Sequence, residues 1–204
     1  MAPINDFGPM LRQEAIRRGM GQVPQVVLLI DGAAGLEGMG YDCFSQSTQI
    51  VDFYHAMEHG GKVLEALLGD KRRPEYERRR RHWAHRLLNN GVETLIRQAR
   101  EESAGKPNQA AVEKELGYFV DNVNRMQYRT FRKKNYFIGS GVIEAGCKTV
   151  IGARCKQAGM FWSLPGAQNA LSIRCLHASK RLSEFWNDRL SKRASSLSNL
   201  DIAA

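Results

Sequence analysis

The sequence predicts a mostly α-helical protein with a small β part. Two short strand candidates, the apolar run at residues 26–30 and the stretch at 49–51, are rich in β-branched side chains, and each is followed by an aspartate. Runs of this length and composition are typical of buried strands. From Phe53 onward the apolar residues mostly recur at helical spacing, which predicts amphipathic helices. We therefore expect a mostly α fold with a small β remnant near the N-terminus.

The run at residues 26–30 lies between Pro24 and the pair Asp31-Gly32. Its continuous apolar character predicts a strand that is buried on both faces, as in parallel sheets. Ligand sites in parallel sheets lie at the carboxyl ends of the strands, and Asp31 stands at that end. The structural alternative is an Asx turn that simply ends the strand.

The chain divides into four predicted segments: residues 1–55 as a partial core, 56–135 as a helical block of about four helices, 136–190 as C-terminal helices, and 191–204 as a disordered tail. Within the first segment we expect a helix over residues 9–19 and a loop with at most one short helix over 32–47. Gly60 and Gly61 are expected to weaken or kink their helix.

The predicted C-terminal helices begin after a basic and aromatic stretch, residues 127–138, which we expect to be an extended or irregular link. A helix over residues 142–156 should follow, and two more should span residues 165–179 and 182–190. In the first of these three helices the spacing predicts one buried stripe. The stripe consists of Ile143, Cys147, Val150 and Ile151.

The charge balance favours a polyanionic partner, most often nucleic acid. The chain has 30 Lys and Arg residues against 21 Asp and Glu residues, a net charge of +9. One basic cluster, Arg78 to Arg81, alternates with Tyr76 and Trp83 along the sequence and is either a solvated face or a phosphate-binding surface. A second basic cluster, residues 129–134, precedes the helix predicted from residue 142. The candidate DNA-binding residues are Arg78, Arg79, Arg80, Arg81, Arg132, Lys133, Lys134 and Lys148.

The four cysteines, at positions 43, 147, 155 and 175, form no C-x-x-C pair, which argues against a zinc ribbon or a redox motif. The N-terminus has no basic stretch followed by an apolar run, and no apolar run approaches the roughly 18 residues of a membrane-spanning helix. We therefore expect a soluble, cytoplasmic protein.

Further acidic and histidine residues are candidates for chemistry. Glu144 lies in the first turn of its predicted helix, where it either complements the helix dipole or points into a site. Asp52 and His55 follow the second strand, and Asp52 either caps the next helix or takes part in catalysis. The spacing of His55, Glu58 and His59 is similar to an inverted metallopeptidase motif, but no further ligand follows it.

Three stretches together resemble the insertion-sequence transposases of the ISKra type, which are related to the Mutator-like DDE group. They read LLIDGA at residues 28–33, QIVDFYHAMEH at 49–59 and IGSGVIEAGCK at 138–148. The shorter stretches GMFWS at 159–163 and RCLH at 174–177 fit the same family. The resemblance covers nearly the whole chain.

The resemblance implies a truncated RNase H-like α/β core that is interrupted by an α-helical insertion. It also implies an active site in which three acidic residues hold two magnesium ions. Asp31 would be the second acid and Glu144 the third, both catalytic and both metal ligands. Asp52 and His55 would match a signature that follows the second acid. Two metal ions roughly 3.5–4 Å apart can stabilise both the attacking and the leaving oxygen of a phosphodiester.

The first acid of the family has no counterpart that we can identify. It would lie on a strand upstream of the first predicted helix, and Asp6 has no strand around it. The sequence also has Ala34-Gly35-Leu36 where the family carries a bulky residue. We therefore expect a transposase part that is catalytically incomplete, with DNA and further transposase chains as partners. The alternative is a non-catalytic DNA-binding or regulatory remnant; an all-helical protein unrelated to DNA is disfavoured by the charge.

Overall fold

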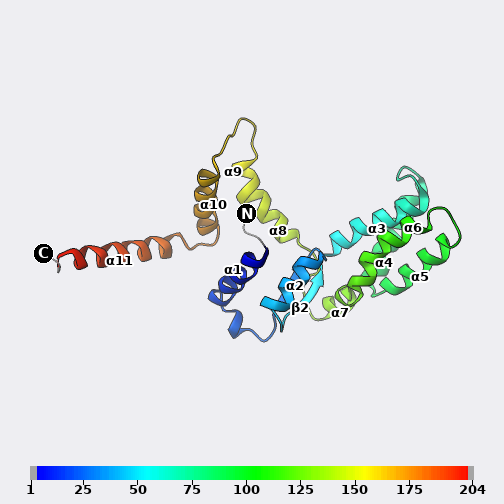
Figure 1. Cartoon of the computed structure of the whole chain (residues 1–204), viewed down its shortest axis with the longest axis horizontal. Coiled ribbons are helices and arrows are strands. Elements are labelled where there is room, and N and C mark those ends of the chain that lie inside the picture. The colour runs from blue at the N-terminus through cyan, green and yellow to red at the C-terminus, as the bar shows by residue number, and fades with distance from the viewer. Residues whose placement is uncertain (1–3, 202–204) are drawn as a thin grey trace. The chain divides into compact units, whose positions relative to one another are not determined.

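The structure, a computed structural model, describes residues 4–201 (Figure 1). The chain forms two units, one up to Ser140 (unit 1) and one from Gly141 onward (unit 2). Both are helical apart from a two-stranded sheet in unit 1. The prediction of a mostly α protein with a small β part is confirmed.

The sheet pairs β1 (Val27–Ile30) with β2 (Thr48–Val51) in parallel, in the register Val27↔Thr48 to Ile30↔Val51. Parallel strands need a crossover connection, and helix α2 (Ala34–Cys43) provides it. The predicted loop at residues 32–47 is therefore mostly helix. Of its glycines, Gly40 lets α2 approach the sheet, because a Cβ there would lie 2.6 Å from Gln49 Nε2.

The expected burial of residues 26–30 on both faces is wrong. Ile30 alone in β1 is buried, and the rest of the strand is half-buried. In β2, by contrast, Ile50 and Val51 are fully buried. β2 joins the hydrophobic core of the helical block, whereas β1 has one strand neighbour within the described chain.

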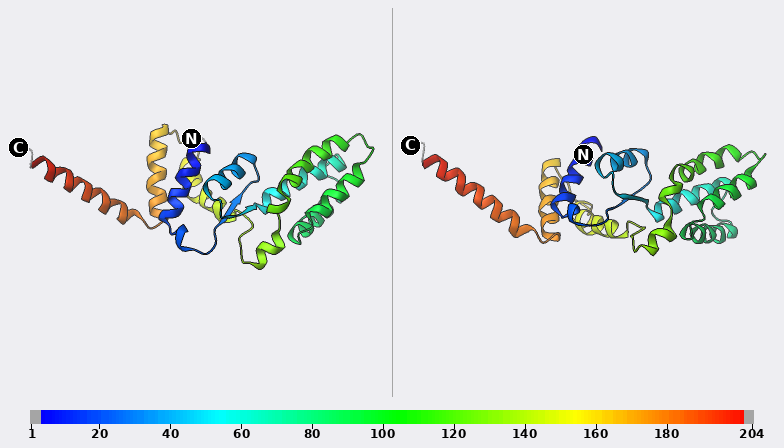
Figure 2. Two further views of the ribbon diagram at one scale, coloured as in Figure 1. Left: turned by 60° about the horizontal axis from the view of Figure 1, so that its bottom comes forward. Right: turned by 90° about the horizontal axis from the view of Figure 1, so that it is seen from below.

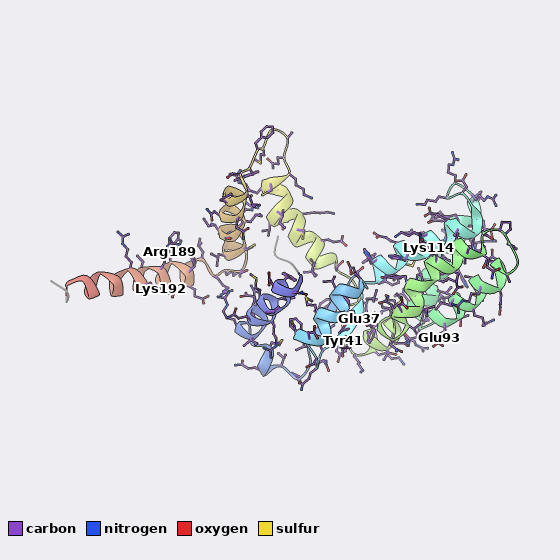
Figure 3. All side chains as sticks on the ribbon, viewed as in Figure 1. Glu37, Tyr41, Glu93, Lys114, Arg189 and Lys192 are labelled. Carbon is purple, nitrogen blue, oxygen red and sulfur yellow. The ribbon has the colours of Figure 1, made fainter. Side chains whose placement is uncertain are left out.

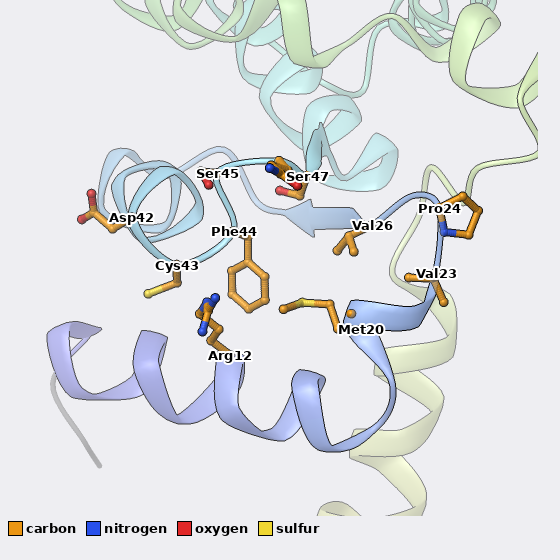
Figure 4. Close-up of a pocket in the computed structure, with 12 residues that line it drawn as sticks. Arg12, Met20, Val23, Pro24, Val26, Asp42, Cys43, Phe44, Ser45 and Ser47 are labelled. Carbon is orange, nitrogen blue, oxygen red and sulfur yellow. The ribbon is translucent and has the colours of Figure 1, made fainter.

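Helix α1 (Ile4–Arg17) begins before the predicted start and runs through Pro9. The short 3-10 helix η1 (Met20–Gln22) follows it. A cavity of about 400 Å³ lies between α1, η1 and the end of α2 (Figure 4). Arg12, Phe44 and Ser47 are among the residues that line it.

The helical block contains the predicted four helices and one more (Figure 2). They are α3 (Phe53–Leu68), α4 (Pro74–Leu88), α5 (Val92–Ser103), α6 (Gln109–Asn122) and α7 (Tyr128–Lys133). Helix α7 lies within the link predicted over residues 127–138, so that prediction is wrong for 128–133, whereas residues 134–138 form neither helix nor strand. Tyr128 and Phe131 of α7 enter the core of the block, and this burial stabilises a helix that is basic elsewhere.

Gly60 and Gly61 lie in the middle of α3, which continues without a break to Leu68. A Cβ at Gly60 would lie 3.0 Å from Trp83 Cε3, and one at Gly61 would lie 2.9 Å from Tyr76 Oη. Both aromatic residues belong to α4. The two glycines thus do not break the helix, and they allow α4 to pack closely on α3.

Unit 2 consists of helices without a buried stripe among its described side chains. They are α8 (Gly141–Gly146), the π-helical turn η3 (Cys147–Gly152), α9 (Ala153–Cys155), α10 (Leu164–Ala178) and α11 (Leu182–Asp201). Ile143 is 60% exposed and Ile151 38% exposed, and Cys147 is exposed too, so the predicted stripe is wrong. Arg174 of α10 donates to Thr149 O at 2.7 Å and to Val150 O at 2.9 Å.

The predicted tail at residues 191–204 is helical up to Asp201, because α11 continues that far, and residues 202–204 lie outside the described chain. No glycine or proline interrupts the sequence of α11. Among the described residues, no helix combines the length and the apolar character that a membrane span requires.

Candidate functional site

The two aspartates that follow the strands lie at the same edge of the sheet. Ile30 pairs with Val51, and the Asp52 N–H donates to Ile30 O at 2.7 Å. Asp31 and Asp52 are the next residues along each strand. Since neighbouring strands lie about 4.8 Å apart, the two residues leave the sheet from adjacent positions. We call this place the carboxyl edge.

Asp52 is a buried cap rather than an open ligand. Its side chain is the N-cap of α3, where Oδ1 accepts from the His55 N–H at 2.9 Å. Oδ2 accepts from the Ser140 N–H. Because each oxygen already accepts a backbone hydrogen bond and the residue is 5% exposed, Asp52 fits a helix cap better than a metal ligand. The predicted capping role is confirmed.

The segment 138–140 returns to the carboxyl edge after the helical block. The Phe53 N–H donates to Ile138 O at 2.8 Å, next to the bond between Ser140 and Asp52. The chain therefore arrives at this edge just before the helix that carries Glu144. The bond from Ser140 to Asp52 could not be predicted from the local sequence, because its donor is a backbone N–H.

Asp31 is half-buried and held by its neighbours. Its Oδ1 accepts from the Ala33 N–H at 2.9 Å, which is the Asx turn of the structural alternative. Its carbonyl accepts from Tyr118 Oη at 2.7 Å. Gly32 has a φ of 86°, and a Cβ there would lie 2.8 Å from Tyr118 Oη. Only glycine fits this turn without strain.

Tyr118 links α6 to the carboxyl edge. Burial, followed by the charges of Asp31 and Asp52, raises the pKa of its phenol, so the hydroxyl stays a neutral donor. The ring of His59 stacks on it, with centroids 3.7 Å apart and planes at 5°. Burial first, and then the charge of Lys62, lowers the pKa of His59. This contact could not be predicted from the local sequence, because Tyr118 and Asp31 are far apart in the chain.

Glu144 and Lys148 belong to unit 2, where both are exposed. Glu144 lies in the first turn of α8, and Lys148 lies in η3. The pairing of Asp31 with Glu144 stays a prediction, because the two residues belong to separate units.

Magnesium prefers carboxylate oxygens, and Asp31 supplies a donor of that kind. Its Oδ2 has no hydrogen bond in the described part of the chain, whereas each oxygen of Asp52 already accepts one. No three His, Cys, Asp or Glu side chains gather as a metal site within residues 4–201. The rings of His55 and His59 lie 5.8 Å apart without a third ligand. Unit 1 thus supplies a carboxylate oxygen of the kind that magnesium prefers. Its described residues supply too few such donors for a complete magnesium site.

The basic residues of α4 differ in what they contact. Arg79 pairs with Glu102 of α5 and with Glu75, so it holds two helices together. Its neighbours Arg78, Arg80 and Arg81 are exposed, as are Arg132, Lys133 and Lys134. Tyr76 and Trp83 are buried, at 7% and 4% exposed. The expected interleaving of these rings with the basic surface is wrong, because they face the core.

Comparison of the chain with protein-family models, with curated proteins and with solved structures gave no match. The assignment of a function therefore depends on the carboxyl edge, on the basic helices and on the sequence motifs.

Proposed function

We propose that the chain is the C-terminal part of the catalytic domain of a DDE transposase of the insertion-sequence type. It would contribute Asp31 as the second acid and Glu144 as the third, bind DNA, and be catalytically incomplete on its own. The core would be RNase H-like, interrupted by the helical block. The observation that carries the proposal is the carboxyl edge, where Asp31 ends one strand beside the segment that leads to Glu144.

The order of the elements supports this proposal. Asp31 follows β1, the crossover helix α2 leads to the parallel strand β2, and the helical block comes next. After the block, Ser140 is bound to Asp52 at the carboxyl edge. Glu144 is four residues farther along. An extended chain spans at most about 3.6 Å per residue, so Glu144 Cα must lie within about 14 Å of Ser140 Cα.

The residues around the edge have distinct roles in this proposal. Asp31 and Glu144 would hold magnesium, which would activate a nucleophile and stabilise the leaving oxygen of a phosphodiester. Tyr118 and Gly32 fix the backbone from which the Asp31 side chain projects. Asp52 fixes the start of the segment that leads to Glu144. The resemblance places the remaining carboxylate on a strand that the described residues do not provide.

A second candidate is a non-catalytic DNA-binding or regulatory remnant of a transposase. The Asx turn of Asp31 favours it, because the carboxylate already has a structural role there. Both candidates predict DNA binding that weakens steeply with salt, since counterions are released from the phosphates. They differ in whether the acidic residues matter for DNA cleavage.

Nicking of supercoiled plasmid DNA in the presence of magnesium separates the two candidates. The chain is assayed alone and after N-terminal extension by the residues encoded immediately upstream. We expect no nicking by the chain alone and nicking by the extended protein. Asp31→Asn and Glu144→Gln should each reduce that nicking about 100-fold or more. The exposed Asp42, changed to Asn, is the matched control and should leave nicking unchanged.

Nicking by the chain alone would contradict catalytic incompleteness. Nicking by the extended protein that survives both acid substitutions would contradict the roles of Asp31 and Glu144. Absence of nicking from both proteins, with DNA binding intact, would favour the regulatory candidate.

A further inference from the structure

Two stretches of unit 1 contain basic residues and no acidic ones. Residues 78–92 hold five arginines and two histidines, and residues 122–140 hold three arginines and two lysines, without any Asp or Glu. In the rest of unit 1 the two signs of charge are mixed. A segregation of this kind concentrates positive potential wherever the two stretches come together.

The fold joins the end of the first stretch to the second. Asn90, just after α4, accepts from the Arg129 N–H at 2.8 Å through Oδ1 and donates to Thr130 Oγ1 at 2.9 Å through Nδ2. Asn90 therefore provides hydrogen-bond partners for a backbone N–H and a side-chain hydroxyl in the first turn of α7. Its positive φ of 60° turns the chain sharply at this point. The C-terminal end of α4 and the N-terminal end of α7 are thereby fixed to each other.

Two of the cations in these stretches serve the fold. Arg79 pairs with Glu102 and Glu75. Arg125 is 7% exposed and pairs with Glu37 at 2.9 Å. The others form no ion pair with any described residue, and we call them the α4–α7 basic surface. They are Arg78, Arg80, Arg81, Arg86, Arg129, Arg132, Lys133 and Lys134.

The α4–α7 basic surface has the chemistry of a phosphate-binding surface. All its members except the half-buried Arg86 are exposed, and most are arginines, whose planar guanidinium can bind a phosphate through two donors. The two large aromatic rings of α4, Tyr76 and Trp83, are turned into the core. Single-stranded nucleic acid is usually held by stacking on several exposed rings. Helices α4 and α7 offer no exposed Phe, Tyr or Trp ring, and Phe137, after α7, is 77% exposed.

We propose that the α4–α7 basic surface binds the phosphate backbone of duplex DNA without reading its sequence. This inference rests on the proposed function only for the choice of DNA as the ligand. Charge complementarity identifies this occupant: duplex DNA carries one negative charge per about 1.7 Å of helix axis. Arg79, although it lies within the same arginine run, takes no part, because its guanidinium is bound to carboxylates.

The test compares two triple variants of the full chain with equal loss of charge. The surface variant is Arg81→Gln, Arg132→Gln, Lys133→Gln. The control variant is Arg97→Gln, Lys106→Gln, Lys114→Gln, which changes exposed cations of α5, the following loop and α6; Figure 3 labels Lys114. Fluorescence anisotropy with a labelled 30-base-pair duplex of arbitrary sequence gives the dissociation constant at several KCl concentrations.

For the surface variant we expect a dissociation constant at least about tenfold higher at low salt. Its plot of log affinity against log salt should be shallower by about 3, because each phosphate contact contributes about 0.9 to the slope. The control variant should stay within about threefold of the wild type. Circular dichroism of both variants checks that the helices are retained. A second duplex of unrelated sequence should bind equally well.

Equal losses in both variants would overturn the proposal, because binding would then reflect net charge alone. Unchanged affinity in the surface variant, with wild-type binding intact, would overturn the surface and leave the proposed function untouched. Absence of wild-type binding to any duplex would contradict the DNA partner itself. Tighter binding to single-stranded DNA of the same length, or to anionic lipid vesicles, would overturn the choice of duplex DNA.

Discussion

At the scale of single residues, the carboxyl edge depends on contacts between segments that are distant in the sequence. Asp31 and Asp52 could be predicted as edge residues because each follows a short apolar run. Their partners could not. Tyr118 Oη lies 2.7 Å from the Asp31 carbonyl oxygen, yet nothing in the local sequence of α6 marks this tyrosine. Ser140 binds Asp52 through its backbone N–H, which any residue except proline could supply.

Replacing Tyr118 by phenylalanine should lower the free energy of unfolding by about 1 kcal/mol, because the Asp31 carbonyl loses its hydrogen-bond donor. The ring and its stacking with His59 are kept. Tyr41→Phe is the control, since Tyr41 is 59% exposed (Figure 3). Urea denaturation followed by circular dichroism measures both. Equal stability of the two variants would show that the bond between Tyr118 and Asp31 does not stabilise the fold.

A second prediction concerns the close approach of α3 and α4. Gly60→Ala should reduce the free energy of unfolding by about 1 kcal/mol, because the strain of overpacking against Trp83 exceeds the gain in helix propensity. Gly117→Ala in α6 is the matched control. A Cβ at Gly117 meets no atom within 4 Å, so this change should stabilise by about 0.5–1 kcal/mol. Stabilisation by both substitutions in urea denaturation would contradict the close packing.

At the scale of elements, the long amphipathic helices were predictable and the short ones were not. The apolar residues of α3 to α6 repeat often enough to define a buried face. Helix α7 has only Tyr128 and Phe131 to bury, and its basic residues hide that pattern. Helix α2 contains Gly35, Gly38 and Gly40, which lower helix propensity. Tertiary packing decides both cases, and the local sequence does not report it.

The pair of Arg79 and Glu102 should make the contact between α4 and α5 sensitive to pH. Hydrogen bonding to Arg79 lowers the pKa of Glu102 below its ordinary value of 4.5. The carboxylate therefore stabilises the fold above pH 4.5, and this contribution is lost as pH falls through the lowered pKa. Glu102→Gln should reduce stability by less than about 1 kcal/mol at pH 7, because the pair is partly exposed.

The difference between wild type and Glu102→Gln should vanish in acid, below the lowered pKa of Glu102. Glu77→Gln is the control on α4, since Glu77 is exposed and forms no ion pair with a described residue. Urea denaturation at a series of pH values between 3 and 7, in about half-unit steps, provides the comparison. A difference that persists unchanged in acid would assign the effect to packing rather than to the charge of Glu102.

At the scale of the whole molecule, the sequence predicted the mostly α composition and the position of the two strands. The prediction was wrong for unit 2, where the apolar stripe of residues 143–151 was expected to be buried. Val142 is 75% exposed and Ile143 60% exposed. Helical spacing shows that a helix has an apolar face, and it does not show what covers that face. The same reasoning applies to β1, whose apolar run is only half-buried.

The central claim is that Asp31 and Glu144 act together on a divalent cation. Mn²⁺ titration of the ¹⁵N-labelled chain, followed by NMR line broadening, tests it most directly. The amides that flank Asp31 and those that flank Glu144 should broaden together at the lowest Mn²⁺ concentrations. In Asp31→Asn, which can keep the Asx turn, broadening should be lost at both places. Broadening around Glu144 that is unchanged in Asp31→Asn, or that spreads equally over exposed acids such as Asp42 and Glu184, would contradict the claim.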